Sequence, residues 1–196
     1  CTLRDGAYIV DGNFGDNAIK GIINNLHKAN IDMIEVGWLK DITHQKGSTY
    51  FQYCEDIIPY LQSDSKQKSY IAMIDYGRYD LNKLSNYDGT SINTIRLVFP
   101  KEKFEEAIEF SSKIKEKGYK LCLQAANTYS YTDIDLIKLA NKVNEVMPEA
   151  LSIVDTFGVM YASDLRHIFM LLDRNLNKKI KLGFHSHNNL QMSFAL

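Results

Sequence analysis

Two histidines separated by one residue give this sequence its clearest chemical signal. His185 and His187 stand in the segment KLGFHSHNNL, although the chain has only five histidines among 196 residues. Residues two apart on a β-strand point to the same side and lie about 7 Å apart, so both imidazoles can turn toward one ion. Imidazole nitrogens are common ligands of divalent metals. The pair therefore predicts a metal site at the end of a strand.

A carboxylate and an arginine in the segment TLRDG could complete such a site. Asp5 offers a hard carboxylate oxygen, and Arg4 offers a planar cation suited to a substrate carboxylate or a developing enolate. Consecutive residues on a strand face opposite ways, so both reach one site only if the strand breaks, which Gly6 permits. An ion pair between Arg4 and Asp5 in a surface turn explains this motif alone equally well.

Glu35 is a charge placed inside the apolar segment IEVGW. A carboxylate buried without a partner is strongly unfavourable, so we expect a cation beside it. Arg4, on the neighbouring predicted strand, is the expected partner. Such an ion pair could close a barrel, aim Arg4 at a substrate, or do both.

Short apolar runs bounded by polar turns predict seven strands, most of them continuously apolar as in a parallel sheet covered on both faces. Segments with helical spacing of apolar residues lie between them, and we expect each strand to be followed by its helix. The predicted strands are residues 1–6, 32–38, 69–76, 94–100, 120–127, 150–158 and 181–188, and the predicted helices are residues 16–29, 103–117, 133–147 and 161–176. We expect Tyr50, Phe51 and Tyr53 to take part in helix packing.

This alternation indicates a parallel sheet with right-handed crossovers, either doubly wound or a (β/α)8 TIM barrel. The first strand is not followed by the glycine fingerprint of doubly wound nucleotide-binding folds, and polar residues gather at carboxyl ends of strands, as in barrel enzymes. We therefore expect residues 1–196 to form a single partial TIM-barrel catalytic domain, with strand 8 and its helix beyond Leu196. Its strands should pair sequentially, leaving residues 1–6 and 181–188 as the two edges.

Composition narrows the class of partner. The formal net charge is −1 and neither sign forms a long block, which argues against nucleic acid or a membrane surface as a partner. No apolar run approaches the roughly 20 residues that span a bilayer. The three cysteines form no CxxC pair, which suits reduced thiols, two buried and one terminal, in a cytoplasmic protein.

Four motifs at successive predicted strand ends resemble one family of metal-dependent barrels. TLRDG, the glutamate of IEVGW, DTFG at residues 155–158 and HSHNN at residues 185–189 are similar to the family of 3-hydroxy-3-methylglutaryl-CoA lyase, 2-isopropylmalate and homocitrate synthases, and 4-hydroxy-2-oxovalerate aldolase. The segment HNNL most resembles the aldolase branch. The resemblance implies that Mn²⁺ or Mg²⁺ is bound by three residues, Asp5, His185 and His187.

The resemblance also implies roles for other residues. Arg4 would steady an enolate, Glu35 would belong to the same catalytic signature, and Thr156 would contact a substrate carboxylate. Asp155 is as readily a structural residue. Arg96 and Asn127 lie on predicted barrel strands from which they could reach the substrate.

One position departs from the aldolase branch. That branch carries a histidine base three residues after the metal-binding aspartate, and Tyr8 stands there in this chain. A tyrosine with its usual pKa near 10 is a poor base at neutral pH, although it can donate a hydrogen bond or act once its pKa is lowered.

The resulting expectation is a carbon–carbon lyase that cleaves a 4-hydroxy-2-oxo acid through a metal-stabilised pyruvate-type enolate. An acyl-CoA-dependent condensing enzyme of the isopropylmalate or homocitrate synthase type uses the same enolate chemistry. A zinc hydrolase would need no arginine beside its ligand, and a non-catalytic metal-binding module is supported by Tyr8. The partner is then a small 2-oxo acid, and a homo-oligomer or a fused or partner enzyme is also compatible with the sequence.

Overall fold

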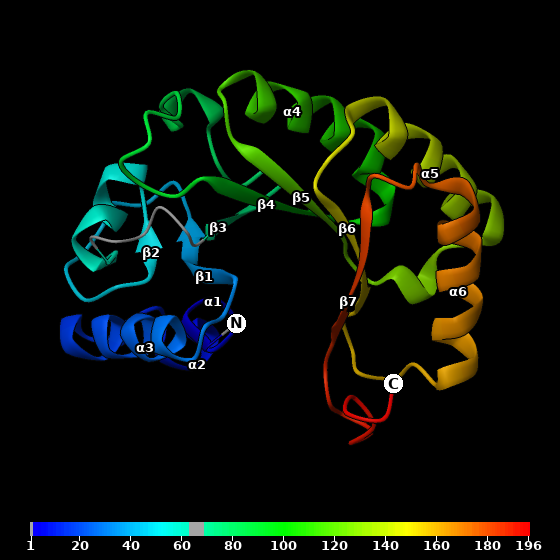
Figure 1. Ribbon diagram of the computed structural model, residues 1–196, viewed down its shortest axis with the longest axis horizontal. Coiled ribbons are helices and arrows are strands. Elements are labelled where there is room, and N and C mark those ends of the chain that lie inside the picture. Colours follow the sequence, from blue (N-terminus) through cyan, green and yellow to red (C-terminus); the bar gives the residue numbers. More distant parts are fainter. Residues whose placement is uncertain (1, 63–68) are drawn as a thin grey trace. The chain divides into compact units, whose positions relative to one another are not determined.

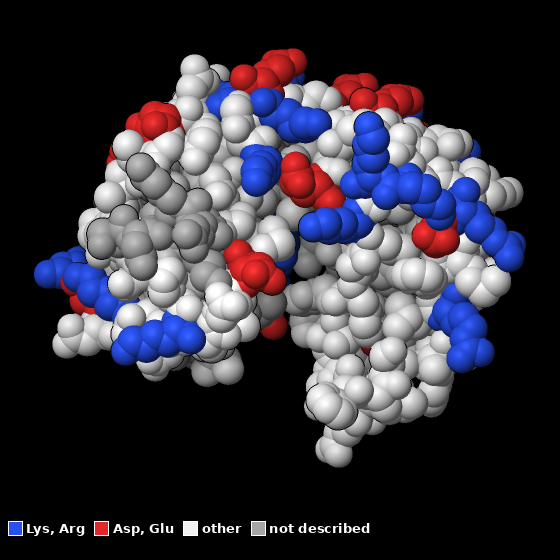
Figure 2. Space-filling view, viewed as in Figure 1, with Lys and Arg blue, Asp and Glu red and all other residues white. Residues whose placement is uncertain are grey.

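The computed structural model describes residues 2–62 and 69–196. The chain divides into two compact units, the first made of Cys1–Arg96 and Glu116–Lys120 and the second of Leu97–Lys115 and Leu121–Leu196. The single catalytic domain expected from the sequence stays a prediction. Charged side chains of both signs are interspersed on the face in Figure 2, in keeping with the small net charge.

The sheet has seven strands in the order β2-β1-β3-β4-β5-β6-β7 (Figure 1). Six of the seven predicted strands are confirmed and follow one another in sequence order, with parallel pairing of β1 to β3, β5 to β6 and β6 to β7. This order is that of a partial (β/α)8 barrel, because a doubly wound sheet reverses its order near the first strand. The six are β1 (Met33–Leu39), β3 (Ser69–Asp75), β4 (Thr94–Phe99), β5 (Lys120–Ala125), β6 (Ala150–Asp155) and β7 (Lys181–Ser186).

The prediction of a strand over residues 1–6 is wrong. Thr2–Asp5 form the helical turn α1 and Ala7–Val10 form α2, while Cys1 lies outside the described residues. Gly6 does not break a strand, since its φ of −64° and ψ of −14° are right-handed helical. A run of four residues is too short for periodicity to separate a strand from a helical turn. Residues 2–6 are therefore not an edge of the sheet.

The edge beside β1 is instead β2 (Tyr50–Phe51), although the sequence predicts helix packing for these two residues. It pairs in parallel with the end of β1, with Trp38 opposite Tyr50 and Leu39 opposite Phe51. Gly37 permits this pairing, because a Cβ there would collide with the backbone oxygen of Thr49. A two-residue strand has no period that a sequence could display.

The predicted helices are confirmed as α3 (Asp16–Lys28), α4 (Phe104–Glu116), α5 (Asp133–Val146) and α6 (Ala162–Asn175). Strict alternation of strand and helix holds from β4 to β7. It fails after β1 and β3, where the described residues form the short 3-10 helices η1 (Cys54–Tyr60) and η3 (Leu81–Lys83). Two further 3-10 turns, η4 (Lys101–Lys103) and η5 (Thr128–Ser130), lie in the second unit.

Each unit buries apolar side chains of its own strands and helices. Ile34, Val36 and Ile71 are fully buried in the first unit, and Leu139 of α5 and Leu151 of β6 in the second. Full burial of one such side chain contributes about 1.5–3 kcal/mol. Cys54 and Cys122 are both buried, as the sequence predicts for two of the three cysteines. Within residues 2–62 and 69–196, the longest apolar helix falls short of what a membrane crossing needs.

Candidate active site

In the first unit, Arg4 is held by two carboxylates. The residue is only 5% exposed, its Nε donates to Oε2 of Glu35 at 3.0 Å, and its Nη1 donates to Oδ1 of Asp5 at 2.9 Å. The backbone oxygen of Arg4 accepts the indole N–H of Trp38 at 2.9 Å. These contacts attach α1 to β1, and the burial of Arg4 excludes a simple surface ion pair. The ion pair expected between Arg4 and Glu35 is therefore present, although Arg4 comes from a helical turn.

Glu35 holds a second arginine as well. Nη1 of Arg96, on β4, donates to Oε1 of Glu35 at 3.0 Å, so each carboxylate oxygen receives a charge-assisted hydrogen bond. The Nε of Arg96 is buried without a hydrogen-bond partner among the described residues. Arg96, predicted to contact the substrate, is thus placed against Glu35, and its reach toward a substrate stays a prediction.

Tyr8 projects from α2 with 66% of its surface exposed, and its ring meets that of Trp38 edge-on at 5.9 Å between centroids. Desolvation of the phenol raises the pKa of Tyr8, and the opposing effect of the Arg4 charge is smaller. The hydroxyl is therefore protonated at neutral pH. In that state it can donate a hydrogen bond or a proton, but it cannot take a proton from the substrate as a general base.

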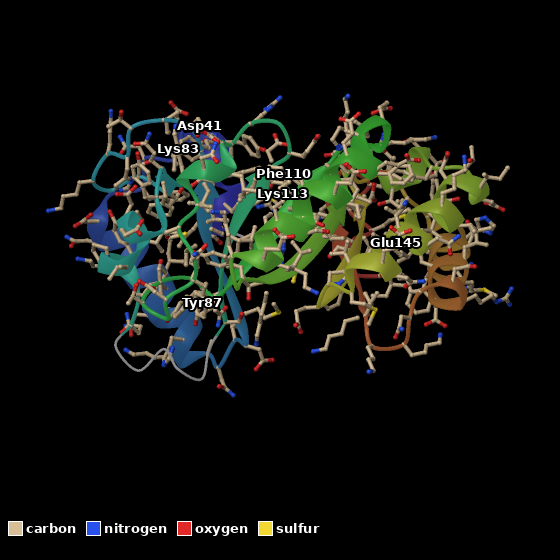
Figure 3. The ribbon with its side chains drawn as sticks, turned by 90° about the horizontal axis from the view of Figure 1, so that it is seen from above. Asp41, Lys83, Tyr87, Phe110, Lys113 and Glu145 are labelled. Atoms are coloured by element: carbon tan, nitrogen blue, oxygen red, sulfur yellow. The ribbon has the colours of Figure 1, made fainter. Side chains whose placement is uncertain are left out.

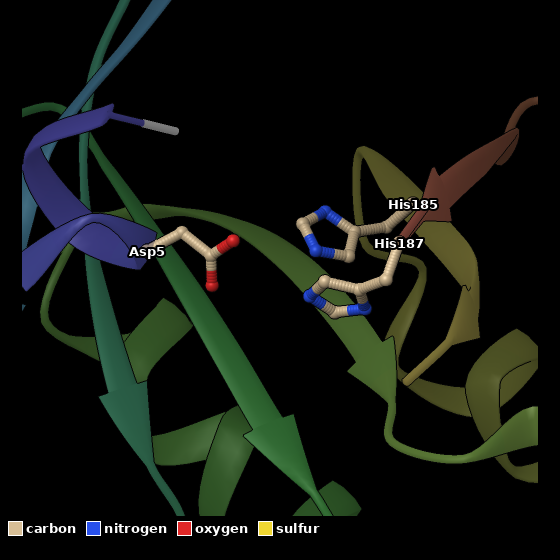
Figure 4. A group of neighbouring side chains, drawn as sticks. All are labelled: Asp5, His185 and His187. Atoms are coloured by element: carbon tan, nitrogen blue, oxygen red, sulfur yellow. The ribbon is translucent and has the colours of Figure 1, made fainter. Parts of the chain in front are cut away.

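In the second unit, His185 lies in β7, and His187 is the first residue after the end of that strand. Their rings lie beside each other (Figure 4), and the ring centroids are 5.0 Å apart. Nδ1 of His187 lies 2.8 Å from the backbone oxygen of Asp155. A carbonyl oxygen only accepts, so Nδ1 carries the hydrogen and the lone pair of the neutral ring resides on Nε2. This backbone support is typical of histidines that bind a metal through Nε2.

Asp155 organises the turn that supports His187. Its buried carboxylate accepts the backbone N–H groups of Val159 at 3.0 Å and Met160 at 3.1 Å, which is a structural role. Gly158 in this turn has φ +63°, and a Cβ there would lie 2.6 Å from the backbone nitrogen of Asn189. The DTFG and HSHNN motifs therefore pack directly on each other.

Thr156 and Asn127, both predicted to bind substrate, lie together in the second unit. The backbone N–H of Asn127 donates to Oγ1 of Thr156 at 2.7 Å. Asn127 adopts the left-handed conformation with φ +49° at the start of η5, two residues after the end of β5. Because the Thr156 oxygen accepts this bond, its hydroxyl hydrogen can donate to an anionic group.

The predicted metal ligands offer one carboxylate oxygen and two imidazole nitrogens. Such a mixed oxygen and nitrogen donor set suits a divalent cation, and the Nδ1 protonation of His187 fits it too. Asp5 extends from α1 in the first unit and the histidines from the end of β7 in the second (Figure 4). Their joint role as ligands stays a prediction.

Two features of the cluster around Arg4, the role of Trp38 and the pairing of Arg96 with Glu35, were not predicted from the sequence. Trp38 anchors the Arg4 backbone, and Arg96 shares Glu35 with Arg4. The single tryptophan of the chain, at the end of a buried strand, was a usable signal. The partner of Arg96 was not, because nothing local in a sequence tells which strand positions face each other.

Comparison with known proteins agrees with these features. The HMGL-like family model matches residues 1–195. An oxaloacetate decarboxylase of Mycobacterium tuberculosis is 24% identical over 202 residues, which cover 99% of this chain and 57% of that protein. A 4-hydroxy-2-oxovalerate aldolase of Bacillus cereus is 21% identical over 199 residues, which cover 98% of this chain and 57% of that protein. The chain thus spans little more than half the length of these curated relatives.

Solved structures show the same fold. The N-terminal domain of a Bacteroides vulgatus protein proposed to be an aldolase superimposes with a TM-score of 0.80 at 19% identity, covering 100% of this chain and 65% of that one. The HMG-CoA lyase of Bacillus subtilis superimposes with a TM-score of 0.72 at 14% identity, covering 99% of this chain and 69% of that one. With a family model that covers nearly all of its residues and a sheet in the matching order, the chain belongs to the HMGL-like family.

Proposed function

We propose that the protein is a divalent-metal-dependent carbon–carbon lyase that cleaves a 4-hydroxy-2-oxo acid into pyruvate and an aldehyde. Two curated relatives are named for 2-oxo acids, oxaloacetate and 4-hydroxy-2-oxovalerate. Breaking the bond between C3 and C4 of either compound leaves the enolate of pyruvate. A shared site would therefore be built to stabilise that enolate.

The placement of Arg4 is the observation that carries the proposal. Its guanidinium is buried and oriented by ion pairs to Glu35 and Asp5, so its charge is fixed before a substrate arrives. A cation that needs no reorganisation stabilises a developing oxyanion more effectively than one that must move into place. Glu35 acts as the positioning residue for Arg4, and Arg96 holds Glu35 from the other side.

Asp5, His185 and His187 would hold the metal, Mn²⁺ or Mg²⁺. When bound, a divalent metal supplies Lewis acidity to the keto and carboxylate oxygens of a 2-oxo acid. His187 enters this role with its tautomer already set by the Asp155 backbone. Thr156 could donate its hydroxyl hydrogen to the substrate carboxylate, with Asn127 fixing the position of that hydroxyl.

Decarboxylation of a 4-carboxy-2-oxo acid such as oxaloacetate is a second candidate, and Tyr8 favours it. Aldol cleavage requires a base to remove the proton of the 4-hydroxyl group as the C3–C4 bond breaks. Tyr8 is protonated at neutral pH and does not provide that base. Loss of CO₂ needs no base, and the enolate left behind needs a proton at C3, which a protonated phenol can donate.

Pyruvate release by the full-length protein tests both candidates. With Mn²⁺ or Mg²⁺, pyruvate and aldehyde from 4-hydroxy-2-oxovalerate support the aldolase, whereas pyruvate and CO₂ from oxaloacetate support the decarboxylase. The Arg4→Lys variant should lose most of kcat with either substrate, because a lysine cannot reproduce the planar, doubly held cation. Release of CoA from acetyl-CoA and a 2-oxo acid, without pyruvate formation, would instead identify a condensing enzyme.

A further inference from the structure

A cavity of about 250 Å³ in the first unit lies beside the cluster around Arg4 and shares Trp38 with it. It opens at the carboxyl ends of β1 and β3, where barrel enzymes place substrate-binding groups. Its lining combines apolar and aromatic side chains, which are typical of small-molecule sites, with four charged residues. The lining residues that matter here are Tyr8, Trp38, Lys40, Asp41, Asp75 and Arg78.

Lys40 is held firmly in this cavity. It directly follows β1, and its backbone N–H donates to the oxygen of Phe51 in β2 at 2.8 Å. Its Nζ lies 3.5 Å from the centroid of the Tyr50 ring and 5.5 Å from that of Trp38. Tyr50 is itself buried, so the ammonium rests against a fixed aromatic face. Desolvation lowers the pKa of Lys40.

The other charges that line the cavity are already paired. Asp41 accepts Nζ of Lys83 at 3.0 Å and the backbone N–H of Asp80 at 2.9 Å, and Figure 3 shows Asp41 beside Lys83. Asp75 pairs with Nε of Arg78 at 3.3 Å. Within the described residues, Lys40 is the lining cation with no carboxylate at ion-pair distance.

The cavity shares its tryptophan with Arg4. The guanidinium carbon of Arg4 lies 5.6 Å from the Trp38 ring, and Nζ of Lys40 lies 5.5 Å from it. Two cations therefore contact one rigid indole, which is anchored by its own hydrogen bond to the Arg4 backbone. A small molecule with an apolar middle and an anionic group at each end is complementary in charge to two cations that flank one indole.

We propose that this cavity binds an anionic group, a carboxylate or a phosphate, through the ammonium of Lys40, with Trp38 as the apolar wall. If the protein is a 2-oxo acid lyase, its substrate then carries a second anionic group on the fragment beyond the cleaved bond. This consequence for the substrate rests on the proposed function, whereas the binding itself requires no catalysis.

Trp38 lines the cavity and allows a direct binding assay, in which a Trp38→Phe variant shows how much of the fluorescence change comes from this position. Full-length protein without added metal is titrated with succinate, with glycerol phosphate and with uncharged succinamide, while tryptophan fluorescence is recorded. Saturable quenching is expected for at least one anion and not for the amide, and the relative affinities of the two anions identify the preferred group. Equal responses to the amide and the anions, or no saturable response, would overturn the proposal.

Variants assign the binding to Lys40. Lys40→Met should weaken anion binding about tenfold, since one charge-assisted hydrogen bond is lost, and Lys40→Arg should retain most of it. Lys46→Met is the matched control, because Lys46 is 85% exposed in the same unit and pairs with Asp16. An unchanged anion affinity in a Lys40→Met protein of normal fold, judged by circular dichroism, contradicts the proposal.

Kinetics separate this proposal from the proposed function. Lys40→Met should raise KM for substrates with a distal anion and leave KM unchanged for substrates without one. Anion binding that depends on Lys40, in a protein that releases no pyruvate, would keep the cavity assignment and reject the lyase. Pyruvate release with no effect of Lys40→Met on anion binding or on KM would keep the lyase and reject the cavity assignment.

Discussion

Glu35 forms ion pairs with two arginines of the first unit. It is 6% exposed and accepts hydrogen bonds from Arg4 and Arg96, so two cations share one buried carboxylate. The sequence predicted the Arg4 contact because a charge inside an apolar strand needs a cation nearby. It did not predict the Arg96 contact, since pairing across the sheet depends on register, which only the folded chain defines.

Glu35→Gln should lower the free energy of unfolding by about 3 kcal/mol. The amide would be left between two guanidinium groups that it cannot neutralise, and its own N–H donors would face theirs. Chemical denaturation measures the change. Removing one of the two cations in the double variant Glu35→Gln, Arg96→Met should restore part of the stability, which shows that the two residues are coupled.

The control for that experiment is Glu145→Gln. Glu145 forms an exposed ion pair with Lys142 at 3.1 Å, and exposed pairs contribute between about 0 and 1 kcal/mol. A Glu35→Gln protein as stable as the Glu145→Gln protein would mean that Glu35 is not needed to balance the two arginines.

The metal ligands make a second prediction at the residue scale. Asp5→Ala, and the double variant His185→Ala, His187→Ala, should each abolish tight Mn²⁺ binding by the full-length protein, measured by calorimetry and by metal content after dialysis. His167→Ala is the control, because His167 pairs with Asp133 on the surface of the second unit. Stoichiometric metal retained by the double variant would refute the ligand assignment.

At the scale of elements, the parts that the sequence predicted are those with a full apolar run. The six strands from β1 to β7 other than β2, and the four long helices, bury enough side chains for their periodicity to be visible. The helical turn α1 and the strand β2 are four and two residues long, and their conformations depend on contacts with β1. Elements of that size are determined by tertiary structure and not by local pattern.

The turn after β6 gives a prediction for an element as a whole. Gly158→Ala should weaken metal binding at least tenfold, because the added Cβ would press on Asn189 and displace the segment that carries His187. The positive φ of Gly158 adds strain for any other residue. Metal affinity and far-ultraviolet circular dichroism are measured together, and unchanged affinity would show that this turn does not position His187.

Thr132→Ala is the matched change in a different element of the same unit. Thr132 caps α5 by accepting the backbone N–H of Asp135, and losing such a cap costs about 1 kcal/mol of stability. It should leave metal affinity unaltered. Equal losses of metal affinity in both variants would point to general destabilisation of the unit as the cause.

At the scale of the whole molecule, tyrosine burial predicts how stability responds to alkaline pH. Desolvation raises the pKa of several tyrosines in the described part of the chain, among them Tyr8, Tyr50, Tyr60, Tyr79, Tyr119 and Tyr131. In the unfolded chain these phenols ionise near pH 10. Between about pH 10 and the higher folded values, the unfolded state therefore loses protons that the folded state keeps.

This difference fixes the sign of the pH dependence. The tyrosine contribution to stability is fully present below about pH 10 and is lost as the pH rises through the folded pKa values, so the free energy of unfolding should fall steeply above pH 10. Denaturant unfolding at a series of pH values measures the fall, and phenolate absorbance should show a group of tyrosines that ionise only as the protein unfolds. Complete titration of all twelve tyrosines near pH 10 in the folded protein, with no loss of structure, would contradict the burial on which the prediction rests.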